Sequence, residues 1–265
     1  MEIKKKSITI FLFGVIGTLL IACNKESQTS INKLPVVEAY LISGKQLSVK
    51  LYYQKSLSDT TQYGSPIIGQ ELYVSDGDKT IELTETKKGT YTFSDTSFLV
   101  VGKTYTLKFN YNLVSVTAKT VIPPKNQNFS SKYVTVNYPG ATTDKIDTLN
   151  KFTWSNPDSL NHVLVFININ GTYTPISTKM SGFRERIYQV DTKRKSNYYI
   201  TTSDFSYYGQ YKVILMSVNQ EYIDLVNSDA SNSNTEKLLN MPTNVVNGLG
   251  IFTAIQTDTL NFNLY

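Results

Sequence analysis

Apolar and polar residues alternate with a period of two in short segments along most of the chain from residue 34 onward. In residues 47–53, Leu47, Val49 and Leu51 are separated by polar side chains. Because successive side chains of a strand point to opposite faces, this period predicts strands with one buried face. In the first half, the expected strands are residues 36–42, 47–53, 71–75, 79–85, 90–93, 105–111 and 114–122.

Turn signals separate these segments. Asp76-Gly77-Asp78 predicts a tight hairpin turn, because Gly77 can take a positive φ. The tripeptide resembles part of a calcium loop, but it lacks the further acidic ligands and the closing glutamate. Pro123-Pro124 ends strand pairing, since proline has no backbone N–H to donate. Closely spaced strands with such turns are typical of an immunoglobulin-like sandwich, here over residues 34–124.

The second half repeats this character with longer connections. A helix is expected over residues 220–227, with Asn219 as its N-cap. The fold class predicted is therefore all-β, with two immunoglobulin-like β-sandwich domains in tandem (residues 34–124 and 125–265) and one short helix in the second. The expected strands are residues 133–137, 149–154, 162–169, 173–178, 184–190, 198–202 and 211–218, a segment 248–252, and a terminal strand around residues 260–264.

A serine- and asparagine-rich loop, residues 228–236, follows the expected helix. Recognition residues concentrate in such loops on rigid scaffolds, and glycines allow another backbone to approach closely. The alternative is a passive loop and a bulge within the sandwich. The candidate partner-contact residues are Ser228, Ser231, Asn232, Gly248 and Gly250.

The first 23 residues are typical of a bacterial lipoprotein signal. Lysines at 4–6 precede an apolar run over residues 8–21, which is too short to favour a permanent membrane span. We expect residues 1–22 to be removed, Cys23 to be acylated and residues 23–33 to form a tether to the lipid bilayer. An ordinary secretory signal, or an anchor helix with an incidental cysteine, is the alternative. The signal-peptidase recognition residues would be Leu20, Ile21 and Ala22, which together with Cys23 form the lipobox.

Composition narrows the functional classes. Residues 1–22 hold three lysines and one glutamate, so the net charge of +5 falls to +3 for residues 23–265. Basic residues form no stripe, which argues against nucleic-acid binding. Cys23 is the only cysteine, so its acylation would leave no thiol for a disulfide, a zinc site or a nucleophile.

Catalytic patterns are missing from the sequence. His162 is the only histidine, and no Gly-x-Ser-x-Gly, phosphate-binding loop or dinucleotide fingerprint occurs. We therefore predict no catalytic residue, no metal site and no cofactor, with His162 in a structural position. A pair of carboxylates working as in a glycoside hydrolase is a less favoured alternative.

Several short motifs occur in an order that resembles the DUF4249 lipoproteins. After the lipobox come Leu34–Leu41, Tyr73–Gly77, Gly89–Tyr91, Val101–Leu107, Thr120–Pro124, Val213–Tyr222 and Asn247–Phe252. The family is a domain of unknown function from Gram-negative bacteria, so no catalytic residue can be carried over. Its members are often encoded beside TonB-dependent transporters.

The resemblance implies a non-enzymatic outer-membrane lipoprotein that cooperates with a TonB-dependent transporter in substrate capture or gating. A structural or adhesive envelope protein is the alternative. In these bacteria, acidic residues after the lipidated cysteine favour display outside the cell. Residues 24–27 contain one such residue, Glu26. The cell surface is accordingly favoured over the periplasmic face, and the ligand is not identified by the sequence.

Overall fold

The structure is a computed structural model that describes residues 33–55, 60–61, 63–139, 148–170, 174–176, 185–229 and 242–265. The chain divides into two compact units, residues 1–33 and 34–265, and the second unit is the one described below. Its described residues are mostly strand, with one α-helix, which confirms the predicted all-β class.

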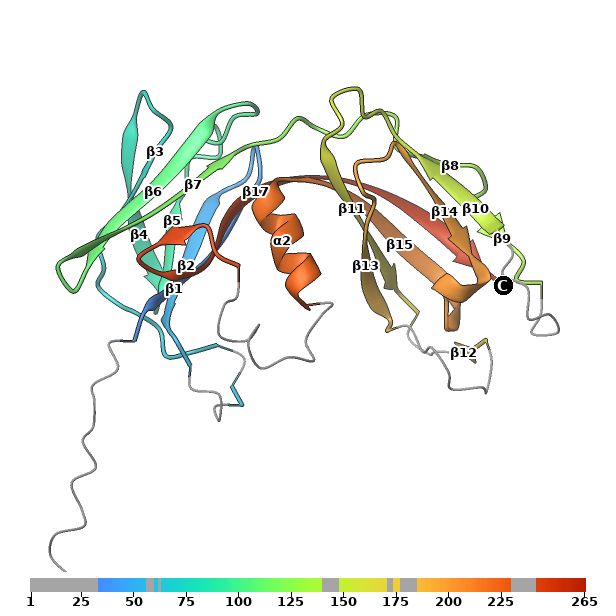
Figure 1. Cartoon of the computed structure of the whole chain (residues 1–265), viewed down its shortest axis with the longest axis horizontal. Coiled ribbons are helices and arrows are strands. Elements are labelled where there is room, and N and C mark those ends of the chain that lie inside the picture. The colour runs from blue at the N-terminus through green and yellow to red at the C-terminus, as the bar shows by residue number, and fades with distance from the viewer. Residues whose placement is uncertain are drawn as a thin grey trace, which may run out of the picture. The chain divides into compact units, whose positions relative to one another are not determined.

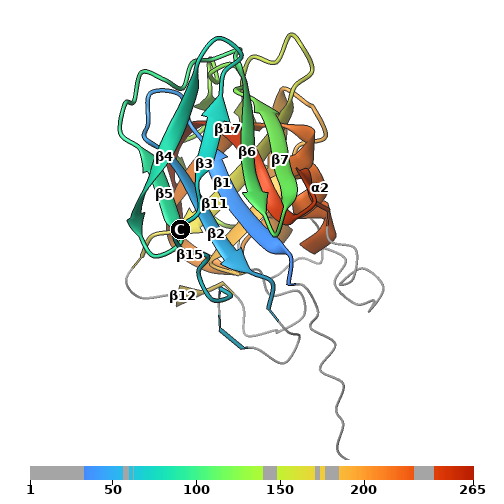
Figure 2. The ribbon, with the colours of Figure 1, turned by 90° about the vertical axis from the view of Figure 1, so that its left-hand side faces the viewer.

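The first seven strands, which are labelled in Figure 2, match the sequence-based expectation. Their buried side chains form one apolar cluster. Leu47, Val49 and Leu51 lie in this cluster, so the period of two does mark a buried face. One strand, β4, pairs with β3 through residues 80–83 and with β5 through residues 84–87, and so passes from one side of the cluster to the other. The strands are β1 (Pro35–Leu41), β2 (Leu47–Tyr53), β3 (Leu72–Ser75), β4 (Thr80–Lys87), β5 (Thr90–Phe93), β6 (Thr104–Tyr111) and β7 (Val114–Val121).

The next strands form a second apolar cluster that is rich in aromatic rings. A three-stranded sheet in the order β14-β10-β8 packs against β11 and β15 of the large sheet. Phe152 of β10 and Phe166 of β11 meet edge to face, with ring centroids 5.9 Å apart. The elements are β8 (Ser130–Ser131), β9 (Thr135–Val136), β10 (Thr148–Thr153), β11 (Asn161–Asn168), β12 (Thr174–Pro175), β13 (Ile187–Asp191), β14 (Asn197–Thr201), the 3₁₀ helix η1 (Thr202–Asp204) and β15 (Tyr207–Val218).

Helix α2 (Gln220–Asp229) confirms the predicted helix, with two further residues at its end. Ile223 packs with Val163 of β11 and Val218 of β15 in a third, small cluster. Asn219, the expected N-cap, uses its side-chain Nδ2 to donate to Thr120 Oγ1 and Val121 O. The start of α2 is therefore held to the end of β7.

The C-terminal strand β17 (Leu249–Leu264) joins the two sets of strands. Its residues 249–254 pair in parallel with β1, and its residues 255–264 pair antiparallel with β15 (Figure 1). Residues 249–252 of the expected segment 248–252 and the expected strand 260–264 thus belong to one strand. Just before it, β16 (Val245–Val246) pairs with β7, a contact that the sequence pattern did not predict.

The tandem arrangement of two domains is not confirmed. Val245, Phe252 and Ala254 belong to the first apolar cluster, although they lie far beyond residue 124. The strands of residues 34–124 therefore share their core with the C-terminal segment. Independent folding of residues 34–124 and 125–265 stays a prediction.

Candidate functional site

A cavity of about 120 Å³ lies beside helix α2, next to the segment predicted to contact a partner. Residues 242–244, which end the connection after α2, form one side of it, and Ile251 of β17 forms part of another. Two acidic residues of α2 also line it. The lining residues are Glu221, Asp224, Pro242, Thr243, Asn244 and Ile251.

Two buried threonines fix the carboxylate of Glu221. Thr120 Oγ1 of β7 donates to Glu221 Oε1 at 2.8 Å, and Thr253 Oγ1 of β17 donates to the same oxygen at 3.0 Å. Thr120 also accepts from Asn219 Nδ2 at 2.8 Å, so its hydroxyl is used as both donor and acceptor. This chain of hydrogen bonds, named here the junction network, ties α2 to both β7 and β17.

Asn244 holds the opposite wall of the cavity. Its Oδ1 accepts from Phe252 N at 3.0 Å, and its Nδ2 donates to Phe252 O at 2.7 Å and Lys119 O at 3.2 Å. One side chain thereby satisfies backbone groups of two strands, β17 and β7, as a paired strand residue would. Asp224 and Thr243 are the exposed residues of the lining; Asp224 Oδ1 accepts from Gln220 Nε2, and Thr243 Oγ1 accepts from Val245 N. The arrangement suits a partner that donates hydrogen bonds.

The structure places the predicted partner-contact residues differently from one another. Ser231 and Asn232 lie outside the described residues. Ser228 is half-buried at the end of α2, and its Oγ donates to Leu225 O at 2.7 Å. That bond occupies the hydroxyl within the helix, so Ser228 contributes no free donor. Its role in contacting a partner stays a prediction.

Gly248 and Gly250 lie against β1 of the same chain. An added Cβ at Gly248 would come within 3.0 Å of Pro35 O, and one at Gly250 would overlap Val37 O. Gly250 also has a φ of +91°, which favours glycine. The close backbone approach that the sequence suggested is therefore made by this chain's own first strand.

A second cavity, of about 90 Å³, lies around His162. Residues 124–127 and the loop 155–160 cover it, and His162 and Ser217 of neighbouring strands form its base. His162 is buried, its Nδ1 lies 3.2 Å from Leu160 O, and its burial lowers its pKa. The imidazole is therefore neutral at pH 7, and the structural role of His162 stays a prediction.

Polar atoms gather beside this second cavity. Ser217 Oγ and Asn126 Oδ1 are buried and have no hydrogen-bond partner in the described part of the chain. Ser217 pairs across the sheet with both His162 and Gln256, so three polar residues stand side by side on adjacent strands. The sequence pattern singled out His162 but not Ser217 or Gln256, because only the pairing of distant strands brings these residues beside it. A polar residue inside a strand that is otherwise buried on both faces is the signal that could have indicated them.

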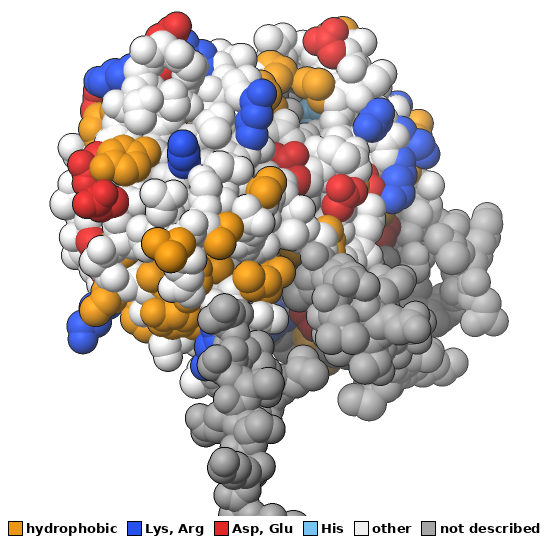
Figure 3. Space-filling model, turned by 60° about the vertical axis from the view of Figure 1, so that its left-hand side comes forward, with side chains coloured by type: hydrophobic (Ala, Val, Ile, Leu, Met, Phe, Trp, Pro, Cys, Tyr) orange, Lys and Arg blue, Asp and Glu red, His pale blue; other side chains and the backbone are white. Residues whose placement is uncertain are grey.

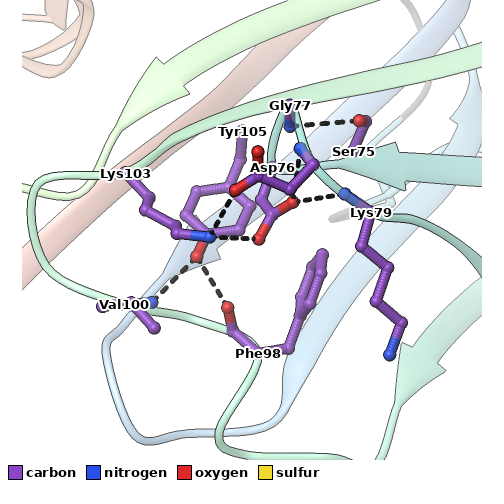
Figure 4. Close-up of polar contacts among 9 residues, drawn as sticks. Ser75, Asp76, Gly77, Lys79, Phe98, Val100, Lys103 and Tyr105 are labelled. Atoms are coloured by element: carbon purple, nitrogen blue, oxygen red, sulfur yellow. Dashed lines mark hydrogen bonds and ion pairs between the residues drawn. The ribbon is translucent and has the colours of Figure 1, made fainter.

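The Asp76-Gly77-Asp78 turn is confirmed as a turn. Asp76 Oδ1 accepts from Asp78 N and Lys79 N, and Lys103 Nζ lies 2.8 Å from Asp76 Oδ2 and 3.1 Å from Asp78 Oδ2 (Figure 4). The hydrogen bond from Lys103, aided by the backbone of Lys79, lowers the pKa of Asp76 to about 2. Both carboxylates thus bind a lysine of the same chain. Behind them, Tyr105 OH accepts from Val100 N and donates to Phe98 O.

Some expectations concern residues that the structure leaves undescribed. Cys23 and the recognition residues Leu20, Ile21 and Ala22 lie outside the described residues. Within the described ranges, no helix has both the length and the apolarity required to cross a bilayer. The same ranges contain no group of three or more His, Cys, Asp or Glu residues placed to hold a metal ion.

Comparison with known families identifies the chain. A family model described as "Domain of unknown function (DUF4249)" matches residues 25–261. The chain belongs to this family. No match was found among curated proteins.

Solved structures give weak similarities. The FN1–FN3 domains of chicken CNTN1 share 13% sequence identity with the chain at a TM-score of 0.28, over 71% of this chain and 63% of that one. An Escherichia coli alpha-2-macroglobulin activated by porcine elastase shares 7% identity at a TM-score of 0.22, over 87% of this chain and 23% of that one. The chain thus covers less than two thirds of the length of each of these two solved structures.

Proposed function

We propose that this DUF4249 protein is a non-enzymatic outer-membrane lipoprotein, an accessory subunit that cooperates with a TonB-dependent transporter in substrate capture or gating. The observation that carries the proposal is the lipobox: Cys23, the only cysteine, ends an apolar run and precedes a polar tether of residues 24–33. Acyl chains on Cys23 would attach the protein stably to a bilayer, where one chain alone would bind marginally.

The cavity beside α2 supports a binding role. Glu221 is held as an acceptor by the junction network, and Asn244 is committed to backbone groups. His162, the only histidine of the chain, lines the other cavity and is therefore not beside Glu221 or Asn244. Side chains fixed in this way present a defined surface, which reduces the ordering cost of binding.

Acylation is tested on protein purified from membranes. Intact mass should show the loss of residues 1–22 and the addition of acyl groups at Cys23, and Cys23→Ala should block both. A full-length chain with an unmodified thiol would refute the anchoring. Proteolysis of intact cells then distinguishes the cell surface, which we favour, from the periplasmic face.

The transporter contact is tested by co-purification from mildly solubilised outer membrane. Thr243 is exposed and lines the cavity, so the larger side chain of Thr243→Arg should obstruct the cavity and lower transporter recovery. Thr80→Arg, at an exposed position at the start of β4, is the matched control and should leave recovery unchanged. Replacing residues 228–236 by a Gly-Ser linker tests the adjoining segment. Equal recovery for all of these variants would place the contact elsewhere.

A further inference from the structure

Four exposed aliphatic side chains gather at the end of the sheet where the described chain begins. Leu34 is 40% exposed, Val114 48%, Val246 58% and Leu113 fully exposed. Figure 3 shows a group of hydrophobic side chains at one end of this face. Single exposed apolar residues are ordinary, whereas a contiguous group marks an interaction site. These four residues are named here the apolar rim.

Contacts between strand ends place the rim residues together. Gln54 N donates to Leu34 O at 3.1 Å, and Tyr53 next to it meets Tyr111 with ring centroids 6.4 Å apart. Tyr111 pairs with Val114 across the β6–β7 hairpin, whose tip carries Leu113.

Val246 joins the same end through the turn before β17. Asn247 Nδ2 donates to Ser115 O at 2.9 Å, which holds this turn beside the start of β7. The four rim residues therefore come from neighbouring strand ends. Leu34 precedes β1, Leu113 lies in the turn between β6 and β7, Val114 begins β7 and Val246 ends β16.

Leu113 has an unusual backbone. Its φ is +66° and that of Asn112 is +48°, so both turn residues lie in the left-handed region. Asn and Gly are favoured at such hairpin positions, and a leucine there is strained. Because the side chain is fully exposed, packing within this chain does not offset the strain. A costly residue that adds nothing to the core points to a role outside it.

We propose that the apolar rim rests on the surface of the phospholipid bilayer that holds the acyl chains of Cys23. This inference rests on the proposed acylation. Ten residues separate Cys23 from Leu34, and an extended chain of that length spans at most about 40 Å. The anchor therefore keeps the rim close to the bilayer, and such confinement makes a weak apolar contact effective.

The shape and chemistry of the rim fit lipid. Leu113 protrudes from the tip of a hairpin, a convex feature that a deformable bilayer accepts without a matching groove. The rim side chains are aliphatic, and the half-buried Tyr53 and Tyr111 stand behind them. Aliphatic residues backed by tyrosines are typical of protein surfaces at the membrane interface.

The experiment uses mature, lipidated protein in vesicles of phosphatidylethanolamine and phosphatidylglycerol. Since acylation consumes the thiol of Cys23, Leu113→Cys would carry the single reactive thiol for an environment-sensitive dye. Val246→Cys reports from a second strand end. Ile187→Cys is the matched control, because Ile187 is also 58% exposed but lies on β13, which pairs with β11. Nitroxide-labelled lipids serve as the quencher.

We expect dye emission at positions 113 and 246 to shift to the blue and to be quenched by the labelled lipids, and dye at 187 to show neither effect. Leu113→Gly should not lower the urea midpoint, because glycine adopts the positive φ freely, yet it should reduce quenching at position 246. Equal, weak quenching at all three sites on protein with acylated Cys23 would overturn the rim proposal and leave the anchor intact. Shielding without vesicles, with a dimer in light scattering, would assign the rim to a second copy and also overturn it. An unmodified Cys23 would overturn the anchor and, with it, the rim proposal.

Discussion

Gly250 tests whether β17 couples the two sets of strands. In Gly250→Ala, the new methyl group would overlap the carbonyl oxygen of Val37 and lie 3.0 Å from Val36 Cγ1. Val37 and Gly250 are partners in the parallel β1–β17 ladder. Neither backbone can move without disturbing Phe252, which is fully buried two residues further along β17.

The expected decrease in the free energy of unfolding has two parts. A non-glycine residue at positive φ costs about 1–2 kcal/mol, partly offset by about 0.4–1 kcal/mol because alanine restricts the unfolded chain. Gly44→Ala isolates this part, since Gly44 has a φ of +73° and nothing within 4 Å of an added Cβ. Separating β1 from β17 would add about 1 kcal/mol for each weakened ladder hydrogen bond. We expect Gly250→Ala to lose about 2–3 kcal/mol more than Gly44→Ala, out of the 5–15 kcal/mol typical of a folded domain.

Urea unfolding of unlipidated residues 24–265 measures both variants. Trp154, the only tryptophan, is buried in the second apolar cluster, so its fluorescence reports on strands that Gly250 does not touch. If β17 couples the clusters, Gly250→Ala lowers the tryptophan midpoint together with the circular-dichroism midpoint. An unchanged tryptophan midpoint would show that the halves unfold separately. Equal losses for Gly250→Ala and Gly44→Ala would refute the close approach of β1.

Three further outcomes are expected. Burial lowers the pKa of His162, so the unfolded chain takes up the proton first and the free energy of unfolding should fall as pH drops below about 6.5; urea titrations should show this slope in the wild type and not in His162→Gln. The hydrogen bond from the Lys103 ammonium lowers the pKa of Asp76 to about 2. The stabilisation that the Lys103–Asp76 contact gives the fold should therefore disappear as pH falls from about 4 towards 2. The free energy of unfolding of Lys103→Met should fall less over that range than that of the wild type. A chain of residues 34–124 should unfold at lower urea than residues 34–265 by circular dichroism, because it lacks Phe252 and the rest of the shared core.

The sequence pattern predicted the strands well because it depends on local alternation. In β2 and β6, three alternate side chains are buried and the fourth, Tyr53 or Tyr111, is half-buried, so the period of two is visible along each strand. The hairpin at Gly77 was likewise local, since its positive φ of +94° required only the glycine itself. The helix was recognisable from Tyr222, Ile223 and Val226, of which Ile223 and Val226 are buried.

Pairing between distant strands was beyond such reasoning. Val37 and Gly250 are partners in the parallel ladder although they lie more than two hundred positions apart. The sequence of neither segment indicates its partner. The two halves of β17 also looked like separate elements, because exposed residues such as Thr257 and Asp258 interrupt its apolar pattern. The domain boundary at Pro124 followed from the local end of pairing there. The local pattern gave no sign that Phe252, far beyond Pro124, belongs to the core of the first seven strands.

The candidate site combines local and distant information in the same way. The loop after α2 was found from composition, whereas the carboxylate of Glu221 acquires its position from Thr120 and Thr253, which are remote in sequence. Thr253 lies two residues before Ile255, where β17 passes from pairing with β1 to pairing with β15. A partner that pulled α2 away would have to break hydrogen bonds to β7 and β17 together. A partner bound at this cavity would therefore act on β17, which contributes residues to both apolar clusters.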